Sequence, residues 1–166
     1  MSDRLLISVL GNRNTGKTTT WHTLFGRDVR TGKHERRLYL NSAQWVNVFL
    51  VSGSPQERQM PIEQMLDGQL PSIVLCSTQY RNEARATFDH FFENDYQVFV
   101  QWLNPGYSDP RKYADNLSFG SYLLDSGASL HVRDGRAAPE PRVGELRQLI
   151  LGWATMRGLV QTDFPA

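Results

Sequence analysis

Apolar runs and amphipathic segments alternate along the chain. The runs are short and largely continuous, as is typical of strands buried on both faces of a parallel sheet; they lie at 5–10, 73–76, 98–103 and 129–132. The amphipathic segments carry apolar residues at helical spacing; they lie at 17–25, 82–96 and 143–156, and region 112–124 is expected to be helical with an interruption at Gly120. This alternation predicts an α/β fold.

Two further strand-like runs, 37–40 and 46–51, are separated by only a few residues. A parallel crossover needs a dozen or more connecting residues, so these two strands are expected to pair antiparallel as a hairpin. Ser54 to Glu57 then resembles a helix start, and Pro61 predicts that this helix is broken or begins late. The expected architecture is a three-layer α/β domain with a mostly parallel sheet and one antiparallel edge hairpin.

Composition narrows the class of protein. The 166 residues are 40% apolar and 21% charged, which suits one folded domain spanning 1–166. The formal net charge of +1 provides no global field for nucleic acid or an anionic membrane. Cys76 is the only cysteine, which excludes an internal disulfide and favours a reducing compartment. Because the N-terminus does not resemble a signal peptide and no apolar run is long enough to cross a bilayer, we expect a cytoplasmic protein with no membrane partner.

The sequence from Gly11 to Thr18 is GNRNTGKT, which fits the pattern GxxxxGK[ST] at every specified position. The motif follows a predicted strand and opens a predicted helix, which is the context in which such a loop binds phosphate. Glycines let the backbone N–H groups turn toward a phosphate, and the helix adds the positive end of its dipole. In this chemistry Lys17 neutralises the β- and γ-phosphates, and the Thr18 hydroxyl is a ligand of Mg²⁺.

Similarity to a known family is concentrated at the same place. It is carried by Gly11-Asn12, Asn14, Gly16-Lys17-Thr18-Thr19 and Leu24-Phe25-Gly26. These residues resemble the phosphate loop and first helix of the translation-factor-related GTPases, the class that includes Ras-like proteins, and the order of predicted elements is similar to that of the whole small-GTPase domain. The resemblance implies a P-loop NTPase that binds ATP or GTP with Mg²⁺. The nucleotide-binding residues that it implies are Gly11, Asn12, Arg13, Asn14, Thr15, Gly16, Lys17, Thr18, Thr19 and Asn104.

The segments with which small GTPases sense the γ-phosphate are altered here. After the third strand that family carries Asp-x-x-Gly, whereas this chain has Ser52-Gly53-Ser54-Pro55. The resemblance places Gln56 where the family has its water-orienting glutamine, so Lys17 and Gln56 are the candidate catalytic residues. It also places Thr31 near the position that offers a hydroxyl to Mg²⁺, so Thr18 and Thr31 are the candidate metal ligands. An ordinary loop hydroxyl is the alternative for Thr31.

Base recognition is altered as well. After the fifth strand the family carries Asn-Lys-x-Asp, whose aspartate reads the guanine ring. The turn here is Asn104-Pro105-Gly106-Tyr107, which retains only the asparagine. The choice between ATP and GTP is therefore left open. Loss of the Asp-x-x-Gly aspartate, which helps to hold Mg²⁺, predicts that nucleotide binding survives better than turnover, so hydrolysis is expected to be slow.

The favoured function is a Mg²⁺-dependent nucleoside triphosphatase that acts as a switch or regulator on a protein partner. The segments Ser52–Arg58 and Arg27–Arg36 are those whose order would then depend on the γ-phosphate. A small P-loop phosphotransferase, or a catalytically dead pseudo-GTPase that serves as an interaction module, is the alternative. The basic loop Arg27–Arg37 permits contact with nucleic acid, but its acidic residues and its lack of interleaved aromatic residues favour a solvated loop.

Overall fold

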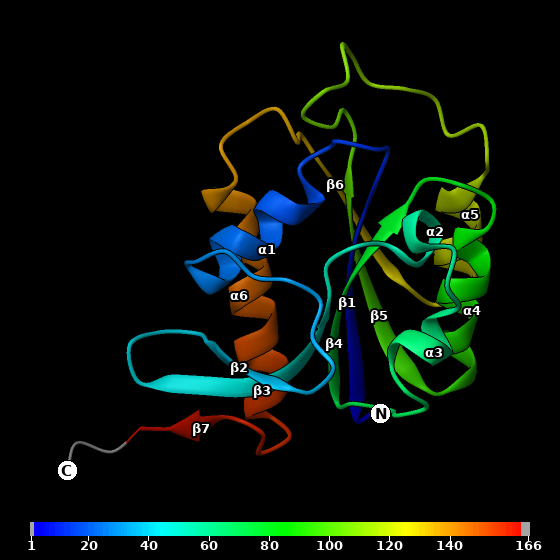
Figure 1. Cartoon of the computed structure of the whole chain (residues 1–166). Coiled ribbons are helices and arrows are strands. Elements are labelled where there is room, and N and C mark those ends of the chain that lie inside the picture. Colours follow the sequence, from blue (N-terminus) through cyan, green and yellow to red (C-terminus); the bar gives the residue numbers. More distant parts are fainter. Residues whose placement is uncertain (1, 164–166) are drawn as a thin grey trace.

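The chain folds around a mostly parallel β-sheet (Figure 1). The computed structural model describes residues 2–163, and over this range the sheet is seven-stranded. Its strands are β1 (Arg4–Gly11), β2 (Arg36–Tyr39), β3 (Gln44–Val51), β4 (Ile73–Gln79), β5 (Tyr96–Leu103), β6 (Ser129–Arg133) and β7 (Gln161–Thr162). Their order in space is β2-β3-β4-β1-β5-β6, and the short β7 pairs with β3.

Helices cover both faces of this sheet, which gives the domain three layers (Figure 1). In the described range they are α1 (Lys17–Phe25), α2 (Pro55–Arg58), α3 (Ile62–Met65), α4 (Ala84–Glu93), α5 (Phe119–Asp125) and α6 (Glu140–Thr155). One face is covered by α1 and α6, and the other by α2 to α5. Across residues 2–163, no helix has both the length and the apolar character that a membrane crossing requires.

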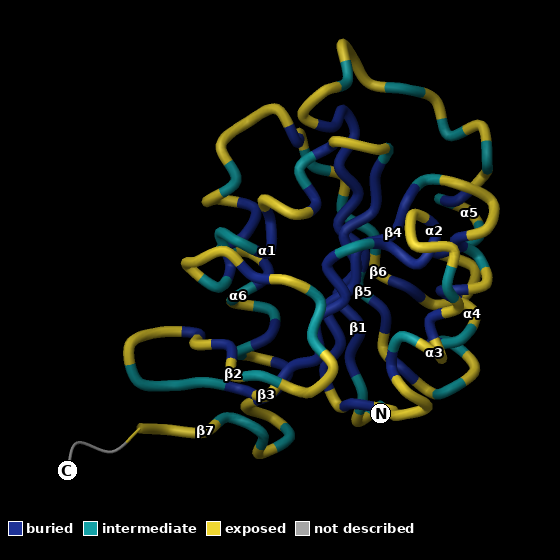
Figure 2. Tube along the Cα trace, in the orientation of Figure 1, coloured by how far each residue is buried: buried dark blue, intermediate teal, exposed yellow. Residues whose placement is uncertain are grey.

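Each face of the sheet has its own hydrophobic core. Under α1 and α6, Trp21 and Leu146 pack with apolar residues of β1 and β3. On the opposite face, Phe88 of α4 and Phe119 of α5 pack with residues of β1 and β4. β1 and β4 are buried almost from end to end because each has a strand on both sides and helices on both faces. Figure 2 shows this as a buried centre surrounded by largely exposed loops.

The parallel strands carry their carboxyl ends to one edge of the sheet, the upper edge in Figure 1. β1 pairs in parallel with β4 on one side and with β5 on the other, while β4 pairs with β3 and β5 with β6. The loops that follow these strands therefore meet at the edge where open α/β sheets bind ligands. Since β4 lies between β1 and β3, the end of β4 stands between the loop after β1 and the segment after β3.

Several sequence predictions are confirmed. The sheet is mostly parallel, and β2 and β3 form the expected antiparallel hairpin. α1 spans Lys17–Phe25 and ends at Gly26, which has a left-handed φ of 70°. Pro61 separates α2 from α3, as expected for a residue that lacks a backbone N–H and disfavours a helix interior.

The predicted helix over 112–124 is wrong in its first half. Within this region the helix α5 begins only at Phe119. The Asp115 carboxylate accepts hydrogen bonds from the backbone N–H groups of Phe119 (2.9 Å) and Gly120 (2.7 Å). These bonds satisfy donors at the helix start and fix its position, so Gly120 lies in the first turn rather than at an interruption.

The end of the chain also departs from the prediction. α6 begins at Glu140 rather than at Val143, and Pro141 lies in its first turn. Proline is accepted there because the first N–H groups of a helix have no intrahelical partner. The short strand β7, which pairs antiparallel with β3, is not predicted by the sequence pattern.

Candidate functional site

The Gly11–Thr18 loop joins the end of β1 to the start of α1 at the carboxyl edge of the sheet (Figure 1). Its backbone takes left-handed conformations at Asn14 (φ 59°) and Gly16 (φ 100°). Gly16 immediately precedes α1, and its conformation is one that favours glycine. Sparsely populated backbone of this kind is concentrated at binding sites.

The Asn104–Asp109 loop, which follows β5, donates hydrogen bonds to carbonyl groups of the Gly11–Thr18 loop, and we call it the supporting loop. The backbone N–H of Ser108 donates to Asn14 O (3.2 Å), and that of Tyr107 donates to Thr15 O (3.0 Å). In a planar trans peptide the C=O and N–H groups point in opposite directions. The N–H groups of Thr15 and Gly16 therefore point away from the supporting loop.

The backbone N–H groups from Asn12 to Thr19 lack protein partners. Among the described residues, none of them donates a hydrogen bond to a protein acceptor, and no side chain caps α1. The first N–H groups of any helix lack intrahelical partners, and here the loop adds its own free donors to them. Such a concentration of donors at the positive end of a helix dipole is suited to an anion.

Lys17 lies against these donors. Its side chain is only 6% exposed, and its Nζ donates to Gly11 O (3.1 Å) and Asn12 O (2.7 Å). The Glu57 Oε1 atom lies 3.9 Å from the same nitrogen. Burial lowers the pKa of Lys17 to about 8, although the negative charges of Glu57 and Asp109 act in the opposite direction. An anionic ligand would stabilise this poorly compensated ammonium group.

Arg142 of α6 is a second buried cation beside the loop. It is 4% exposed, and its guanidinium donates to Thr20 Oγ1, Gln101 Oε1 (3.2 Å) and Gly16 O (3.5 Å). Burial lowers the pKa of Arg142 to about 10. Its Nε has no hydrogen-bond partner, and no carboxylate pairs with it in the part of the chain that the structure describes. Lys17 and Arg142 together make this edge of the sheet electropositive.

A cavity of about 740 Å³ opens in front of the loop, which is room enough for a nucleotide-sized ligand. Its walls are Arg13–Thr19, Glu57, Tyr107–Ser108, Gly135–Pro139 and Arg142. The Gly135–Pro139 wall follows β6 and is absent from the sequence prediction. The signal that points to it is topological, because β6 adjoins β5 and so brings its following loop to the same edge.

Close packing explains why Gly106 in the supporting loop and Gly135 in the loop after β6 are glycines. A Cβ on Gly106 would lie 2.1 Å from Thr15 Cγ2 and 2.9 Å from Thr15 Cα. A Cβ on Gly135 would lie 2.8 Å from Thr15 O. These approaches are too short for any real side chain, so only glycine lets both loops press against Thr15, which is 1% exposed.

The structure brings most of the predicted nucleotide-binding residues together. Arg13, Asn14, Thr15, Gly16, Lys17, Thr18 and Thr19 all line the large cavity. Gly11 ends β1, and Asn12 lines a smaller neighbouring cavity together with Asp109. Asn104 does not line the large cavity. Its side chain instead donates to Tyr113 O (2.9 Å) and accepts from Tyr113 N (3.0 Å), which holds the 104–113 loop closed.

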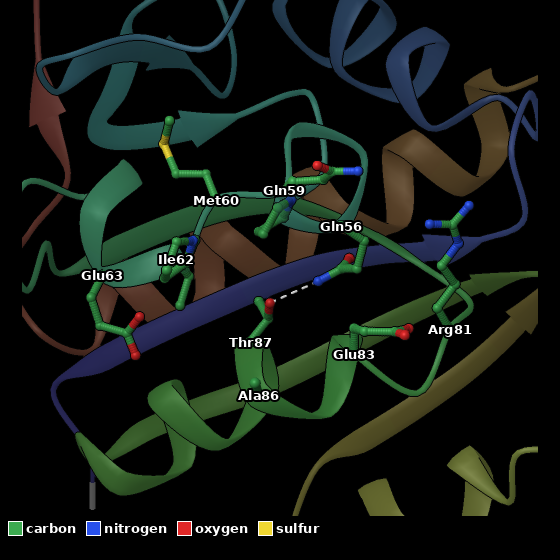
Figure 3. Close-up of a pocket in the computed structure, with 11 residues that line it drawn as sticks. Gln56, Gln59, Met60, Ile62, Glu63, Arg81, Glu83, Ala86 and Thr87 are labelled. Atoms are coloured by element: carbon green, nitrogen blue, oxygen red, sulfur yellow. Dashed lines mark hydrogen bonds between the residues drawn. The ribbon is translucent and has the colours of Figure 1, made fainter.

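Gln56 is engaged elsewhere. Its Oε1 accepts from the backbone N–H of Gln79 (2.9 Å), and its Nε2 donates to Thr87 Oγ1 (2.9 Å), so α2 is fastened to β4 and α4. Figure 3 shows the amide directed at Thr87 in the wall of a cavity of about 480 Å³ between α2, α3 and α4. The residue as a whole is 9% exposed. Both ends of the amide therefore have a structural role in this conformation.

Thr31 also lies apart from the Gly11–Thr18 loop. Its hydroxyl oxygen accepts from the backbone N–H groups of Ser52 (2.8 Å) and Gly53 (3.3 Å) and from the guanidinium of Arg58 (3.3 Å). It is not part of the large cavity wall. Thr31 thus joins the two segments that the sequence analysis expected to respond to the γ-phosphate.

The remaining candidate chemistry is sparse. Within residues 2–163, no cluster of three or more His, Cys, Asp or Glu side chains is arranged to hold a metal ion. Cys76 is fully buried in β4, and burial raises the pKa of its thiol, which makes it a poor nucleophile. No protein-family model matches the chain, and no curated protein matches it significantly.

Proposed function

We propose that this protein binds a nucleoside triphosphate, ATP or GTP, with Mg²⁺ at the Gly11–Thr18 loop and hydrolyses it slowly. The observation that carries the proposal is the run of backbone N–H groups from Asn12 to Thr19 that have no protein acceptor among the described residues. Lys17 and Arg142 add buried positive charge at the same place. Free donors and cations at a helix N-terminus match the oxygens of a phosphate chain.

Thr18 is the residue that suits Mg²⁺. Its side chain is exposed and lines the large cavity at the first turn of α1. Mg²⁺ usually keeps several waters and is held by one or two protein groups together with substrate phosphates, so the site needs no cluster of carboxylates. Thr31 suits the ion less well because its oxygen already accepts three hydrogen bonds. Bound Mg²⁺ would neutralise charge on the phosphate oxygens.

The base and ribose are expected between the supporting loop and the loop that follows β6. Tyr107–Ser108 and Gly135–Pro139 form the cavity walls beyond the Gly11–Thr18 loop. Asp109, the acidic residue nearest the altered base-recognition turn, accepts a hydrogen bond from Gly106 N (2.8 Å) and does not line this cavity. A carboxylate that reads guanine is therefore not supplied by Asp109, and the proposal covers both ATP and GTP.

The contact between Lys17 and Glu57 supports the switch role that we propose for this protein. Phosphates that bind Lys17 must share it with the Glu57 carboxylate, which lies 3.9 Å away. Glu57 belongs to α2, and α2 is tied through Arg58 to Thr31 in the basic loop. We therefore expect the protein partner to contact the exposed residues of Arg27–Arg36 and of Ser52–Arg58, whose arrangement would differ between the free and the nucleotide-bound protein.

The test is titration of fluorescent ATP and GTP analogues with and without Mg²⁺. Lys17→Ala should abolish saturable binding, because it removes the buried ammonium while leaving the fold intact. Lys33→Ala is the matched control, since Lys33 is exposed in the basic loop and should bind like the wild type. Absence of binding by folded wild-type protein to either nucleotide would overturn the proposal and leave an interaction module as the function.

A further inference from the structure

A smaller cavity adjoins the Gly11–Thr18 loop on the β4 side. Its volume is about 320 Å³, and every residue that lines it is polar or charged: Arg13, Gln56, Glu57, Gln59, Gln79 and Arg81. Arg13 and Glu57 also line the large cavity. The small cavity therefore borders the end of the large one at which Lys17 and Glu57 meet, which is the phosphate end of the proposed nucleotide site.

Gln79 supplies an unsatisfied group to this small cavity. It is the last residue of β4 and pairs with Gly11 of β1 in the parallel register. The residue is 6% exposed, and its Oε1 has no hydrogen-bond partner within the described chain. A buried acceptor without a partner is costly and rare, so the atom indicates a place for a small polar molecule.

Glu57 supplies a carboxylate at the border of the two cavities. Its backbone N–H donates to Ser54 Oγ (3.1 Å), the N-cap of α2, and its own side chain is 41% exposed. The preceding residue, Gln56, is fastened to Gln79 and Thr87. In the ligand-free protein the backbone of Glu57 is therefore held in place by its neighbours in α2.

We infer that the small cavity holds the attacking water of nucleotide hydrolysis, with Glu57 as its base and Gln79 as its second hydrogen-bond partner. This inference rests on the proposed function. The water needs two acceptors for its two protons; the Glu57 carboxylate lies where the two cavities meet, and Gln79, whose Oε1 has no partner among the described residues, lines the small cavity. Gln56, the residue that the sequence favours for this task, instead holds the backbone of Gln79 in place.

Hydrolysis at this site exchanges one phosphorus–oxygen bond for another. The water oxygen bonds to the γ-phosphorus while the bond from that phosphorus to the β,γ-bridging oxygen breaks. One water proton passes to the Glu57 carboxylate and then to solvent. The electron pair of the broken bond remains on the β-phosphate, where Lys17 neutralises it. The products are the nucleoside diphosphate and inorganic phosphate.

The experiment compares binding with turnover in the whole protein. Dissociation constants for ATP and GTP and single-turnover phosphate release are measured for Glu57→Gln, Gln79→Met and the control Glu63→Gln. Glu57→Gln should lower phosphate release about 100-fold, yet bind nucleotide at least as tightly, because a negative charge beside the phosphates is gone. Gln79→Met should lower release roughly 10-fold and leave the dissociation constants unchanged. Glu63→Gln should match the wild type, since Glu63 lies on α3 away from this cavity.

The outcomes separate this inference from the proposed function. Wild-type release rates in both Glu57→Gln and Gln79→Met, with nucleotide binding intact, would overturn the inference and leave the binding proposal standing. Binding without any phosphate release by the wild type would do the same. Failure of the wild type to bind nucleotide would overturn the proposed function, and the inference with it. If Gln79→Met does not fold, Gln79→Asn provides the same comparison, because it withdraws the oxygen while keeping an amide.

Discussion

The Gly11–Thr18 loop and the Asn104–Asp109 loop follow the neighbouring parallel strands β1 and β5 and contact each other, but they use their backbone donors in opposite ways. In the Asn104–Asp109 loop every residue that has a backbone N–H donates it to a protein acceptor. In the other loop the N–H groups from Asn12 onward donate to no protein acceptor among the described residues. Folding normally pairs such groups, so the contrast separates a supporting loop from the loop that we propose to bind phosphate.

The supporting loop also determines how the Gly11–Thr18 loop is oriented. The backbone N–H groups of Tyr107 and Ser108 donate hydrogen bonds to the carbonyl oxygens of Thr15 and Asn14. The N–H groups of the same peptide units therefore point away from the supporting loop. Gly106 presses on the Thr15 side chain from the same side. The free donors are thus held in place by a loop whose own polar groups are satisfied, which is the preorganisation that an anion site needs.

Gly106→Ala should disrupt the contact between the two loops and have the largest effect on stability and ATP affinity. The new Cβ would lie 2.1 Å from Thr15 Cγ2 and 2.9 Å from its Cα, so the two loops must separate. We expect the free energy of unfolding to fall by about 3 kcal/mol, measured by chemical denaturation, and ATP affinity to fall at least roughly tenfold. Gly144→Ala in α6 is the control, because its Cβ would meet nothing within 4 Å. Equal stability and affinity in the Gly106 variant and the wild type would contradict the supporting role.

The pH dependence of ATP binding tests whether the Lys17 ammonium group contacts the phosphates. Burial holds its pKa at about 8 in the free protein, and bound phosphates would raise it, so binding above that pH requires uptake of a proton. The dissociation constant should therefore be nearly constant below about pH 8 and rise about tenfold per pH unit above it, or about 1.4 kcal/mol per unit. A dissociation constant that stays flat from pH 7 to 9.5 would mean that Lys17 does not meet the phosphates.

The lowered pKa of Lys17 also predicts that the stability of the ligand-free protein increases with pH. The unfolded chain holds the Lys17 proton more tightly than the folded protein does, with a pKa near 10.5 against about 8. The cost of the buried charge is thus fully present below about pH 8 and is relieved as the pH rises toward 10.5. Between about pH 8 and 10.5 the free energy of unfolding of the ligand-free protein should therefore increase relative to that of Lys17→Met, because methionine does not titrate.

Thr15→Val should have a smaller effect of opposite sign. The Thr15 hydroxyl is buried and has no partner in the described part of the chain, so replacing it by a methyl group removes an unsatisfied donor. We expect the free energy of unfolding to rise by about 1 kcal/mol, with ATP affinity unchanged because the proposed donors are backbone groups. Thr20→Val is the contrasting variant and should destabilise, since the Thr20 hydroxyl donates to Gly16 O (2.9 Å) and accepts from Arg142.

The sequence predicts those parts of this comparison that depend on local pattern. The bounds of α1 follow from helical spacing and a glycine stop, and the β2–β3 hairpin follows from the short separation of two apolar runs. The phosphate-binding candidates from Arg13 to Thr19 line one cavity because they belong to one short loop. In these cases local pattern is sufficient because the interacting residues are close in the chain.

Partners from distant parts of the chain account for what could not be predicted. Thr31 is held by groups that follow β3, and the α5 start depends on an Asp115 carboxylate that also accepts from the Tyr80 hydroxyl (2.6 Å). Gln79 lies beside the Gly11–Thr18 loop because β4 pairs with β1, a spatial order that periodicity does not encode. The Gly135–Pro139 wall depends likewise on the pairing of β6 with β5.

Asp109→Asn should give the smallest effect and isolates the electrostatic link between the two loops. Asp109 accepts from Gly106 N (2.8 Å), a bond that an asparagine oxygen can keep, and its charge is one of the two that oppose the lowering of the Lys17 pKa. Removing the charge should move the rise in the ATP dissociation constant to lower pH by roughly a few tenths of a unit. Asp134→Asn is the control, because Asp134 accepts from the backbone N–H of Arg136 (2.8 Å) and is not among the charges that act on Lys17. A shift in Asp109→Asn alone would mean that the supporting loop tunes the lysine as well as positioning the donors, whereas equal shifts would assign the effect to the net charge of the protein.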